Sequence, residues 1–539
     1  MPALVEQVQE AQSEAQPSPM GEAIGTANQQ EPLARLCADQ SFIEKVPIAF
    51  ARKHLLLGIV DECGGPLRVL FVDRAQLTKV EVVGRLLDRE VVPVLLEAPD
   101  AGAELVSAIN AAYESKCGQV LPVLEAMDRD AVLAESQALA AHEDLLDVSD
   151  RAPVIKLVNL LLFEAIRARA SDVHVQPYEH TVVARSRIDG ILEDAFEIPK
   201  PLQEEVLSRI KVMGRMNIAE KRLPQDGRAT VDIGDRSVDL RIATLPTAHG
   251  ERAVLRLLEK GNRLLTLTEL GMDAPTSVTV RQMITAEHGI VLVTGPTGSG
   301  KTTTLYAALR ELNHRERNII TIEDPIEYQL QGISQTQVSE KKGLTFASAL
   351  RSVLRQDPDV IMVGEIRDRE TAVMAIQSSL TGHFVFSTLH TNDAPSAVAR
   401  LLDLGIEPFL VTSSLIGVVA QRLARRICAE CGRLRQPTPA EVDRLRAHHR
   451  WREGLDIAAR TGCAACRGVG LRGRIGLFEV LHMSPQVQAL VHQRASSSDL
   501  KVLAAREGMR TLAECGLDRV VEGVTTFEEV DRVTIRTGG

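Results

Sequence analysis

The chain has 539 residues, which suggests roughly three or four domains and leaves ample length for large cores. A net charge of −10 and an aromatic content of 3% argue against broad, non-specific nucleic-acid binding and against base-stacking surfaces. No run of about 18 or more apolar residues occurs, so we expect no segment to span a membrane. The N-terminal stretch Met1–Gln7 lacks the basic flank and apolar core of a secretory signal, which favours a cytosolic protein.

The N-terminal part of the chain predicts a tail, a small domain and a linker. Residues 1–35 are rich in Ala, Gln, Glu, Ser and Pro and predict a disordered tail. Residues 36–117 have the patterning of a small α+β domain. We predict a docking role for this domain by elimination only, because its sequence shows no catalytic or ligand-binding motif. Its patterns predict one strand and two helices: Leu67–Asp73, Val80–Leu87 and Ala101–Tyr113. Residues 118–150 predict a partly helical linker.

A second α+β domain is predicted over residues 151–258. Helices are expected at Val154–Ala168 and Leu202–Met213. Glycines punctuate the short strand-like runs, which lie at Asp172–Val175, Val182–Arg187, Ala229–Ile233 and Val238–Ala243. We therefore expect an antiparallel sheet with helices packed on it. A solvated, salt-bridged face explains most of its charged residues, and the alternative is that a few arginines reach a nucleotide on another domain or subunit.

After a predicted hinge linker at residues 259–263, residues 264–426 carry a phosphate-binding loop. The segment Gly295–Thr302 fits G-x-x-x-x-G-K-[ST], with an apolar run before it and a helical pattern after it. Glycines let the backbone N–H groups face a phosphate, Lys301 can reach the β- and γ-phosphates, and Thr302 can ligate Mg²⁺. The residues expected to bind nucleotide are Gly295, Pro296, Thr297, Gly298, Ser299, Gly300, Lys301, Thr302 and Thr303. The flanks argue against a chance glycine-rich turn.

Alternating apolar runs and helical stretches surround the loop. The runs lie at Ile290–Val293, Ile319–Ile322, Val360–Val363 and Phe384–Ser387. Short buried strands separated by helices are typical of a mainly parallel α/β sheet. The predicted fold class is therefore an α/β P-loop (RecA-like) ATPase core, preceded by the α+β domains and followed by a cysteine-containing helical part.

Two acidic strand ends can complete a phosphoryl-transfer site. Glu323, Asp324 and Glu327 lie in a proline-broken turn after the second apolar run, where turn chemistry alone is the alternative. The segment Asp357–Glu365 resembles a Walker B strand with a glutamate at its tip. We predict that Glu365 positions or deprotonates the attacking water.

Two histidines bracket the last apolar run of this region. His383 precedes the run and His390 follows it. Histidine can sense a γ-phosphate by hydrogen bonding and charge, so both are candidates for the site. A satisfied structural histidine is the alternative for each.

Two C-x-x-C pairs mark the C-terminal part, Cys428 with Cys431 and Cys463 with Cys466. Each pair can give two thiolates to one tetrahedral Zn²⁺, whereas a redox dithiol needs one pair only. We predict a tetracysteine zinc module over residues 427–475. A helical part is expected over residues 476–539.

Together these motifs resemble the secretion ATPases that power type II protein secretion and type IV pilus assembly. The resemblance covers roughly residues 150–535, with a weaker match over 36–117. The segments that carry it, besides the four cysteines, are Ala170–Pro177, Ala219–Arg228, Thr247–Arg252, Gly295–Thr302, Thr321–Tyr328, Gly364–Asp368, Thr381–Asp393 and Gly473–Glu479.

The resemblance implies a homohexameric ring in the cytoplasm that uses ATP, Mg²⁺ and Zn²⁺. It implies that the second, PAS-like domain closes with the core on ATP and that Arg228, Arg241 and Arg256 reach the phosphates, with Arg241 and Arg228 favoured. It also implies that residues 36–117 hold an inner-membrane platform protein, so that the chain lies at the inner face of the membrane without inserting. Pilus-retracting members generally lack the cysteines, which favours secretion or assembly.

The predicted function is an ATP-hydrolysing motor for type II secretion, acting in pseudopilus assembly. A pilus-extension ATPase is the alternative within the family. A nucleic-acid-translocating ring is disfavoured by acidity and few aromatic residues, so no nucleic-acid partner is expected. A non-catalytic scaffold is disfavoured by the intact motifs.

Overall fold

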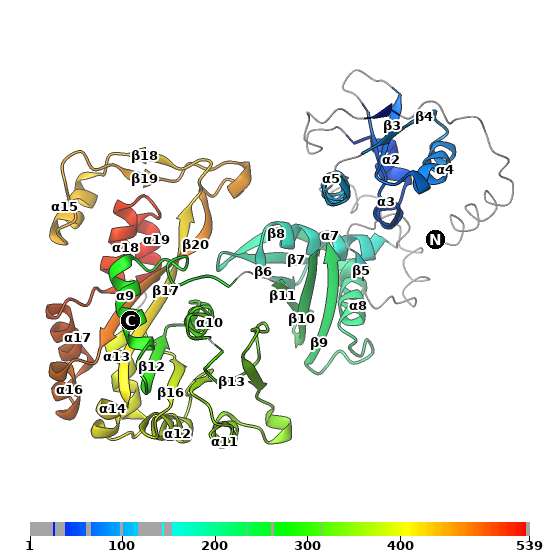
Figure 1. The fold of residues 1–539 in the computed structure, drawn as a ribbon. Coiled ribbons are helices and arrows are strands. Elements are labelled where there is room, and N and C mark those ends of the chain that lie inside the picture. Colours follow the sequence, from blue (N-terminus) through cyan, green and yellow to red (C-terminus); the bar gives the residue numbers. More distant parts are fainter. Residues whose placement is uncertain are drawn as a thin grey trace. The chain divides into compact units, whose positions relative to one another are not determined.

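The computed structural model describes residues 25–26, 38–60, 66–96, 101–116, 143–144, 153–233, 236–259, 264–313 and 315–534. It divides into two compact units, residues 1–260 and 261–539 (Figure 1). The predicted tail, linker and hinge lie outside the described residues apart from β1 (Gly25–Thr26), β5 (Glu143–Asp144) and Glu259. Within the described ranges, no helix is both long enough and apolar enough to cross a membrane.

The N-terminal part of the first unit is a small α/β fold. Its sheet has the strand order β1-β4-β3-β2, with β2 at Leu57–Ile59, β3 at Leu67–Phe71 and β4 at Val91–Leu95. The helices are α2 (Gln40–Lys45), α3 (Ile48–His54), α4 (Leu77–Leu87) and α5 (Ala101–Lys116). The predicted strand and both predicted helices are confirmed. The buried Tyr113 hydroxyl donates to the Val46 carbonyl at 2.6 Å and ties α5 to the end of α2.

A second sheet follows, with strand order β5-β9-β10-β11-β6-β7-β8. Its antiparallel strands are β6 (Ala170–Pro177), β7 (Thr181–Ile188), β8 (Ile191–Pro199), β9 (Gln225–Ile233), β10 (Arg236–Thr247) and β11 (Gly250–Glu259). Helices α7 (Pro153–Arg167) and α8 (Gln203–Met213) pack against each other beside it. The predicted antiparallel sheet is confirmed. Sequence analysis missed β8, in which only Ile198 is buried, and β11, whose arginines interrupt the apolar pattern.

The second unit contains a seven-stranded sheet with the order β14-β13-β15-β16-β12-β17-β20. All neighbouring strands are parallel except β17 and β20. Their bounds are β12 (Gly289–Thr294), β13 (Ile319–Glu323), β14 (Ser334–Gln337), β15 (Val360–Val363), β16 (Phe384–Leu389), β17 (Leu415–Ile427) and β20 (Leu471–His482). The four predicted apolar runs are β12, β13, β15 and β16, so the predicted parallel α/β core is confirmed.

Helices cover both faces of this sheet, which is why its central strands are buried at every residue and mostly apolar (Figure 1). One face packs against α9 (Ala274–Ile284) and α10 (Lys301–Leu312). The other packs against α11 (Phe346–Val353), α12 (Arg369–Leu380) and α13 (Ala394–Asp403). Alternate residues of β12 divide between the two cores, as a pleated strand requires: Val291 and Val293 face α10, and Ile290 and Leu292 face away from it.

Strand β20 was not anticipated, and it joins regions that the sequence separates. It runs antiparallel to β17 and spans the predicted boundary between the tetracysteine module and the helical C-terminal part. Its glycines and arginines hide the apolar alternation of a strand, so no local pattern reveals it. The core sheet therefore continues beyond residue 426, where the sequence predicts its end.

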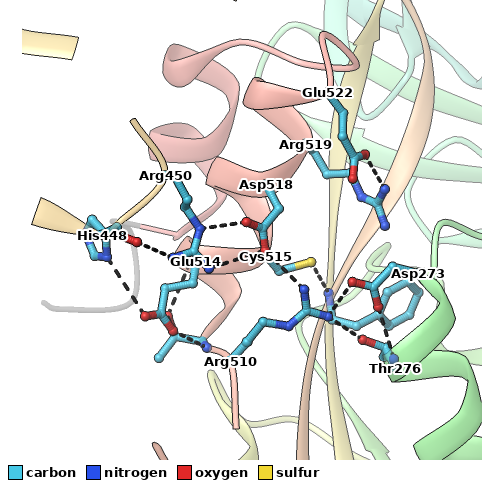
Figure 2. Close-up of polar contacts among 12 residues, drawn as sticks. Asp273, Thr276, His448, Arg450, Arg510, Glu514, Cys515, Asp518, Arg519 and Glu522 are labelled. Atoms are coloured by element: carbon cyan, nitrogen blue, oxygen red, sulfur yellow. Dashed lines mark hydrogen bonds and ion pairs between the residues drawn. The ribbon is translucent and has the colours of Figure 1, made fainter. Parts of the chain in front are cut away.

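The C-terminal helices are α14 (Pro408–Ser414), α15 (Pro439–Ala447), α16 (Pro485–His492), α17 (Ser497–Arg506), α18 (Leu512–Val521) and α19 (Phe527–Thr534). Ion pairs fasten α18 to the rest of the unit (Figure 2). Arg510 joins Asp273, the N-cap of α9, at 2.5 Å and Asp518 of α18 at 3.1 Å. Arg450 joins Asp518 at 2.6 Å.

A buried carboxylate anchors α19 to β17. Glu529 accepts hydrogen bonds from the backbone N–H of Arg425 at 3.1 Å and from its guanidinium at 2.5 Å, and Arg532 adds a third donor at 2.8 Å. Burial opposes ionisation, but these hydrogen bonds outweigh it and lower the pKa of Glu529 to about 2.

This anchor predicts a pH-dependent stability. The folded pKa of Glu529 lies below its ordinary value of 4.5, so its ionised form stabilises the fold above about pH 4.5 and less as the pH falls towards 2. At pH 7 we expect Glu529→Gln to lower the free energy of unfolding by about 3 kcal/mol, because it leaves arginines without their partner. Urea titrations followed by Trp451 fluorescence measure this, since Trp451 packs beside α18 and α19.

The difference in the free energy of unfolding between wild type and Glu529→Gln should become smaller below pH 4.5. The neighbouring exposed Glu528 provides the control, and Glu528→Gln should leave stability nearly unchanged. A difference that stays constant from pH 7 to pH 3.5 would contradict the anchor.

Candidate nucleotide-binding site

The phosphate loop connects β12 to α10. Its glycines at positions 295, 298 and 300 have φ angles of +151°, +78° and +88°, a region in which other residues are strained. A Cβ on Gly295 would also lie 2.6 Å from the Gln421 carbonyl oxygen. Helix α10 begins at Lys301, directly after Gly300, so the free N–H groups of its first turn lie at the loop. The backbone therefore has the form that an anion requires.

Lys301 lies inside this loop. Its Nζ donates to the carbonyl oxygens of Gly295 at 2.7 Å and Pro296 at 3.2 Å. Burial lowers the pKa of Lys301 to about 8; the charge of Arg422 adds to the effect and the Glu365 carboxylate opposes it. A bound phosphate would place a negative charge beside the Lys301 ammonium group, whose hydrogen-bond acceptors here are neutral carbonyl oxygens.

Glu365 and His390 lie at the same edge of the sheet as the loop. Strands β15, β16 and β12 are parallel neighbours, so the residues that follow them gather at one edge. The Glu365 carboxylate pairs with Arg367 at 2.5 Å and lies 3.6 Å from His390 Nε2. Burial lowers the pKa of His390, and the charges of Lys301 and Arg367 lower it further. This favours a neutral imidazole that can donate or accept a hydrogen bond.

The sequence predicts Glu323 in the turn after β13, but the structure places it as the last residue of the strand itself. Glu323 is 3% exposed, and its oxygens accept hydrogen bonds from Tyr306 and Thr321, both at 2.5 Å, and from Gln335 at 3.0 Å. Tyr306 belongs to α10, so Glu323 braces the phosphate-loop helix against β13 and β14. Asp324 is exposed and Glu327 is half-buried in the turn that follows.

His383 lies at the opposite end of β16 from His390. Its Nδ1 lies 2.9 Å from the Ser378 carbonyl oxygen and 3.1 Å from the Thr381 hydroxyl, at the C-terminal end of α12. The six residues of β16 separate it from the loop by roughly 20 Å. The structure therefore places His383 at the C-terminal end of α12, away from the loop of the same unit, and does not support the prediction that it senses the γ-phosphate there.

Sequence analysis missed two buried polar residues of β17 that lie beside the loop. Gln421 accepts a hydrogen bond from the Thr304 hydroxyl at 2.6 Å. Arg422 donates to the carbonyl oxygen of Asn392 at 3.0 Å, just after His390, and burial lowers its pKa. A polar pair inside an otherwise apolar strand, Val418–Ala424, is the signal that could have revealed them.

The three predicted arginines gather on the second sheet of the first unit. Arg241 of β10 stands opposite Arg228 of β9 on one side and Arg256 of β11 on the other. All three line one pocket of about 390 Å³. Arg256 also pairs with Asp172 at 3.0 Å. Such a concentration of guanidinium groups suits an anionic ligand.

The four cysteines converge on one point of the second unit. Their Sγ atoms all lie within 4.8 Å of one another, with Cys428 to Cys463 at 3.8 Å and Cys431 to Cys466 at 3.7 Å. Backbone N–H groups of Cys463 and Gly470 point at the Cys466 sulfur, both at 3.1 Å. This donor set fits one tetrahedral metal ion.

Comparisons with known proteins give a consistent family. Residues 147–532 match the family described as Type II/IV secretion system protein. The chain is 43% identical over 500 residues to the Type II secretion system ATPase E of Vibrio cholerae, which covers 92% of this chain and 98% of that protein. It is 44% identical over 516 residues to the Type II secretion system protein E of Pseudomonas aeruginosa, which covers 93% and 99%.

A solved structure agrees at the level of the fold. The X-ray structure of the Legionella pneumophila ATPase DotB is similar with a TM-score of 0.52 and 19% sequence identity, over 74% of this chain and 100% of that one.

Proposed function

The chain belongs to the Type II/IV secretion system protein family, and on that basis we propose that it is the cytoplasmic, ATP-hydrolysing motor of type II protein secretion. The observation that carries this proposal is the phosphate loop with Glu365 and His390 beside it, in a chain that matches Type II secretion system ATPase E along nearly its whole length. The relatives reported above are type II secretion proteins, which favours secretion over pilus extension.

In the proposed mechanism, the loop amides and Lys301 hold the β- and γ-phosphates. Thr302 would hold Mg²⁺, which neutralises phosphate charge when bound, and Asp324 and Glu327 remain candidates for binding the nucleotide. Glu365 orients a water and accepts its proton while the water oxygen attacks the γ-phosphorus and the bond to the bridging oxygen breaks. His390 would support Glu365 and sense the γ-phosphate, and Glu323 would act by positioning α10.

Substitution of Glu365 tests this assignment. Glu365→Gln keeps the shape of the side chain but cannot accept the proton, so ATP turnover should fall at least about 100-fold while the Kd for ATP stays within a few fold. Lys301→Ala should instead abolish ATP binding. Turnover and equilibrium binding on the same preparations measure both effects.

The exposed Glu370 of α12 provides the control, and Glu370→Gln should change neither quantity. Turnover that survives in Glu365→Gln would remove Glu365 from the mechanism.

We further propose that Arg228, Arg241 and Arg256 neutralise the charge that develops on the phosphates in a homohexameric ring, with residues 259–263 as the hinge between the two units. Their shared pocket and their register on adjacent strands support this. Arg241→Ala should lower turnover about 1,000-fold, as the loss of an arginine finger does, whereas Arg167→Ala on α7 should leave it unchanged.

Mixing the arginine variant with a loop variant identifies the subunit that supplies the arginine. If it comes from a neighbour, Arg241→Ala mixed with Lys301→Ala should regain a fraction of wild-type turnover, because some interfaces combine an intact loop with an intact arginine. If it comes from the same chain, the mixture stays inactive. An Arg241→Ala variant with wild-type turnover would contradict the proposed role.

We propose that Cys428, Cys431, Cys463 and Cys466 hold one structural Zn²⁺. Zn–S bonds of about 2.3 Å in a tetrahedron place sulfur atoms about 3.8 Å apart, close to the observed spacing. Metal analysis of the purified chain should find one zinc per chain, and Cys431→Ser or Cys466→Ser should reduce it. Cys515→Ser, at a buried cysteine outside the cluster, should retain it. A zinc content unaffected by the cluster variants would exclude the site.

Residues 36–117 are the proposed docking domain for an inner-membrane platform protein, which would hold the chain at the membrane without insertion. The described part of this segment has its own sheet and helices, which supports a separate docking domain. Removal of residues 1–117 should release the protein from the membrane fraction, and persistent membrane association would contradict it.

A further inference from the structure

Gln421 is a polar residue in a buried and largely apolar stretch of β17. It is 1% exposed in β17, where its buried neighbours Val418, Val419 and Ala420 are apolar. Burying an amide costs free energy unless it forms hydrogen bonds, so a leucine or valine would suit this strand better. Its Oε1 accepts a hydrogen bond from the Thr304 hydroxyl at 2.6 Å, and Thr304 is itself 3% exposed.

Gln421 also borders the phosphate loop at both of its ends. Strand β17 runs parallel to β12, with Ala420 opposite Thr294, so Gln421 stands beside the point where the loop begins. A Cβ on Gly295 would lie 2.6 Å from its carbonyl oxygen, and a Cβ on Gly300 would lie 2.9 Å from its Nε2. One residue thus leaves no room for a side chain at the first or the last glycine and, through Thr304, binds the first turn of α10.

We propose that Gln421 is a positioning residue for ATP binding, which fixes the phosphate loop and the start of α10 in the shape that receives the phosphates. A loop held in its binding shape loses less conformational freedom when the ligand arrives, so affinity increases without a direct contact. The Thr304–Gln421 hydrogen bond supplies this restraint from outside the loop. The inference rests on the proposed function of the loop in binding ATP.

The test compares variants of the two partners in the full chain. Gln421→Leu and Thr304→Val each remove the hydrogen bond and nearly keep the volume, whereas Thr304→Ser keeps the hydroxyl. We expect the first two to raise the KM and the Kd for Mg-ATP about five- to tenfold, the effect of one buried hydrogen bond, with kcat within about twofold. Thr304→Ser should bind like wild type. Steady-state turnover and titration with Mg-ATP measure these values.

A double variant separates a shared interaction from two independent defects. Because both substitutions break the same bond, Gln421→Leu with Thr304→Val should bind no more weakly than the worse single variant. Thr412→Val in α14 makes the same chemical change at a buried threonine, whose hydroxyl donates to the Pro408 carbonyl oxygen, and it should lower the Tm without changing KM.

Three results would overturn the inference: an unchanged KM in Thr304→Val, single effects that multiply in the double variant, or an equal KM change in Thr412→Val. If Gln421→Leu does not fold, the comparison of Thr304→Val with Thr304→Ser decides alone. A wild-type chain that fails to bind Mg-ATP overturns the proposed function and this inference with it. Wild-type binding with equal binding by the variants overturns the inference only.

Discussion

The parallel pairing of β12 with β16 and β17 is the constraint on which the site depends. It brings the glycine loop, which follows β12, and His390, which follows β16, to one edge of the sheet, beside Gln421 within β17. The adjacent β15 adds Glu365 to the same edge. The buried hydroxyl of Thr294 strengthens the arrangement, because it accepts the Thr391 N–H at 2.9 Å and so ties the end of β12 to the segment after β16.

The same geometry separates residues that look alike in sequence. His383 and His390 bracket one strand, so they occupy opposite edges of the sheet and only His390 reaches the loop. Glu323 ends β13 and Glu365 follows β15, but Glu323 accepts hydrogen bonds from α10 and β14, whereas Glu365 pairs with Arg367 and lies beside His390. The position of a residue along its strand determines at which end of the sheet it lies. The side chains around it determine whether it is hydrogen-bonded within the protein or available to a ligand.

The features that sequence predicts well are those encoded by contiguous residues. The loop from Gly295 to Thr302, with its flanking strand and helix, needs only local backbone preferences, and the buried strands of the parallel sheet are short apolar runs. The hydrogen bond between Thr304 and Gln421 joins residues 117 positions apart and follows from the strand order, which no local pattern contains. Strand β20 was missed for a related reason, since its pairing with β17, not its own composition, makes it a strand.

Strand β17 connects two parts of the unit, because its middle lies beside the phosphate loop and its C-terminal end leads into the cysteine cluster. It passes Gln421 beside the loop and ends at Ile427, where Cys428, the next residue, donates its N–H to Gly470 at 3.0 Å. Side chains alternate along a strand, so a slip of one residue would turn Gln421 to the other face of the sheet and remove it from the loop. The cysteine cluster and the Glu529 anchor hold the far end of this strand in place, and they thereby protect the alignment of the strand at a loop several residues away.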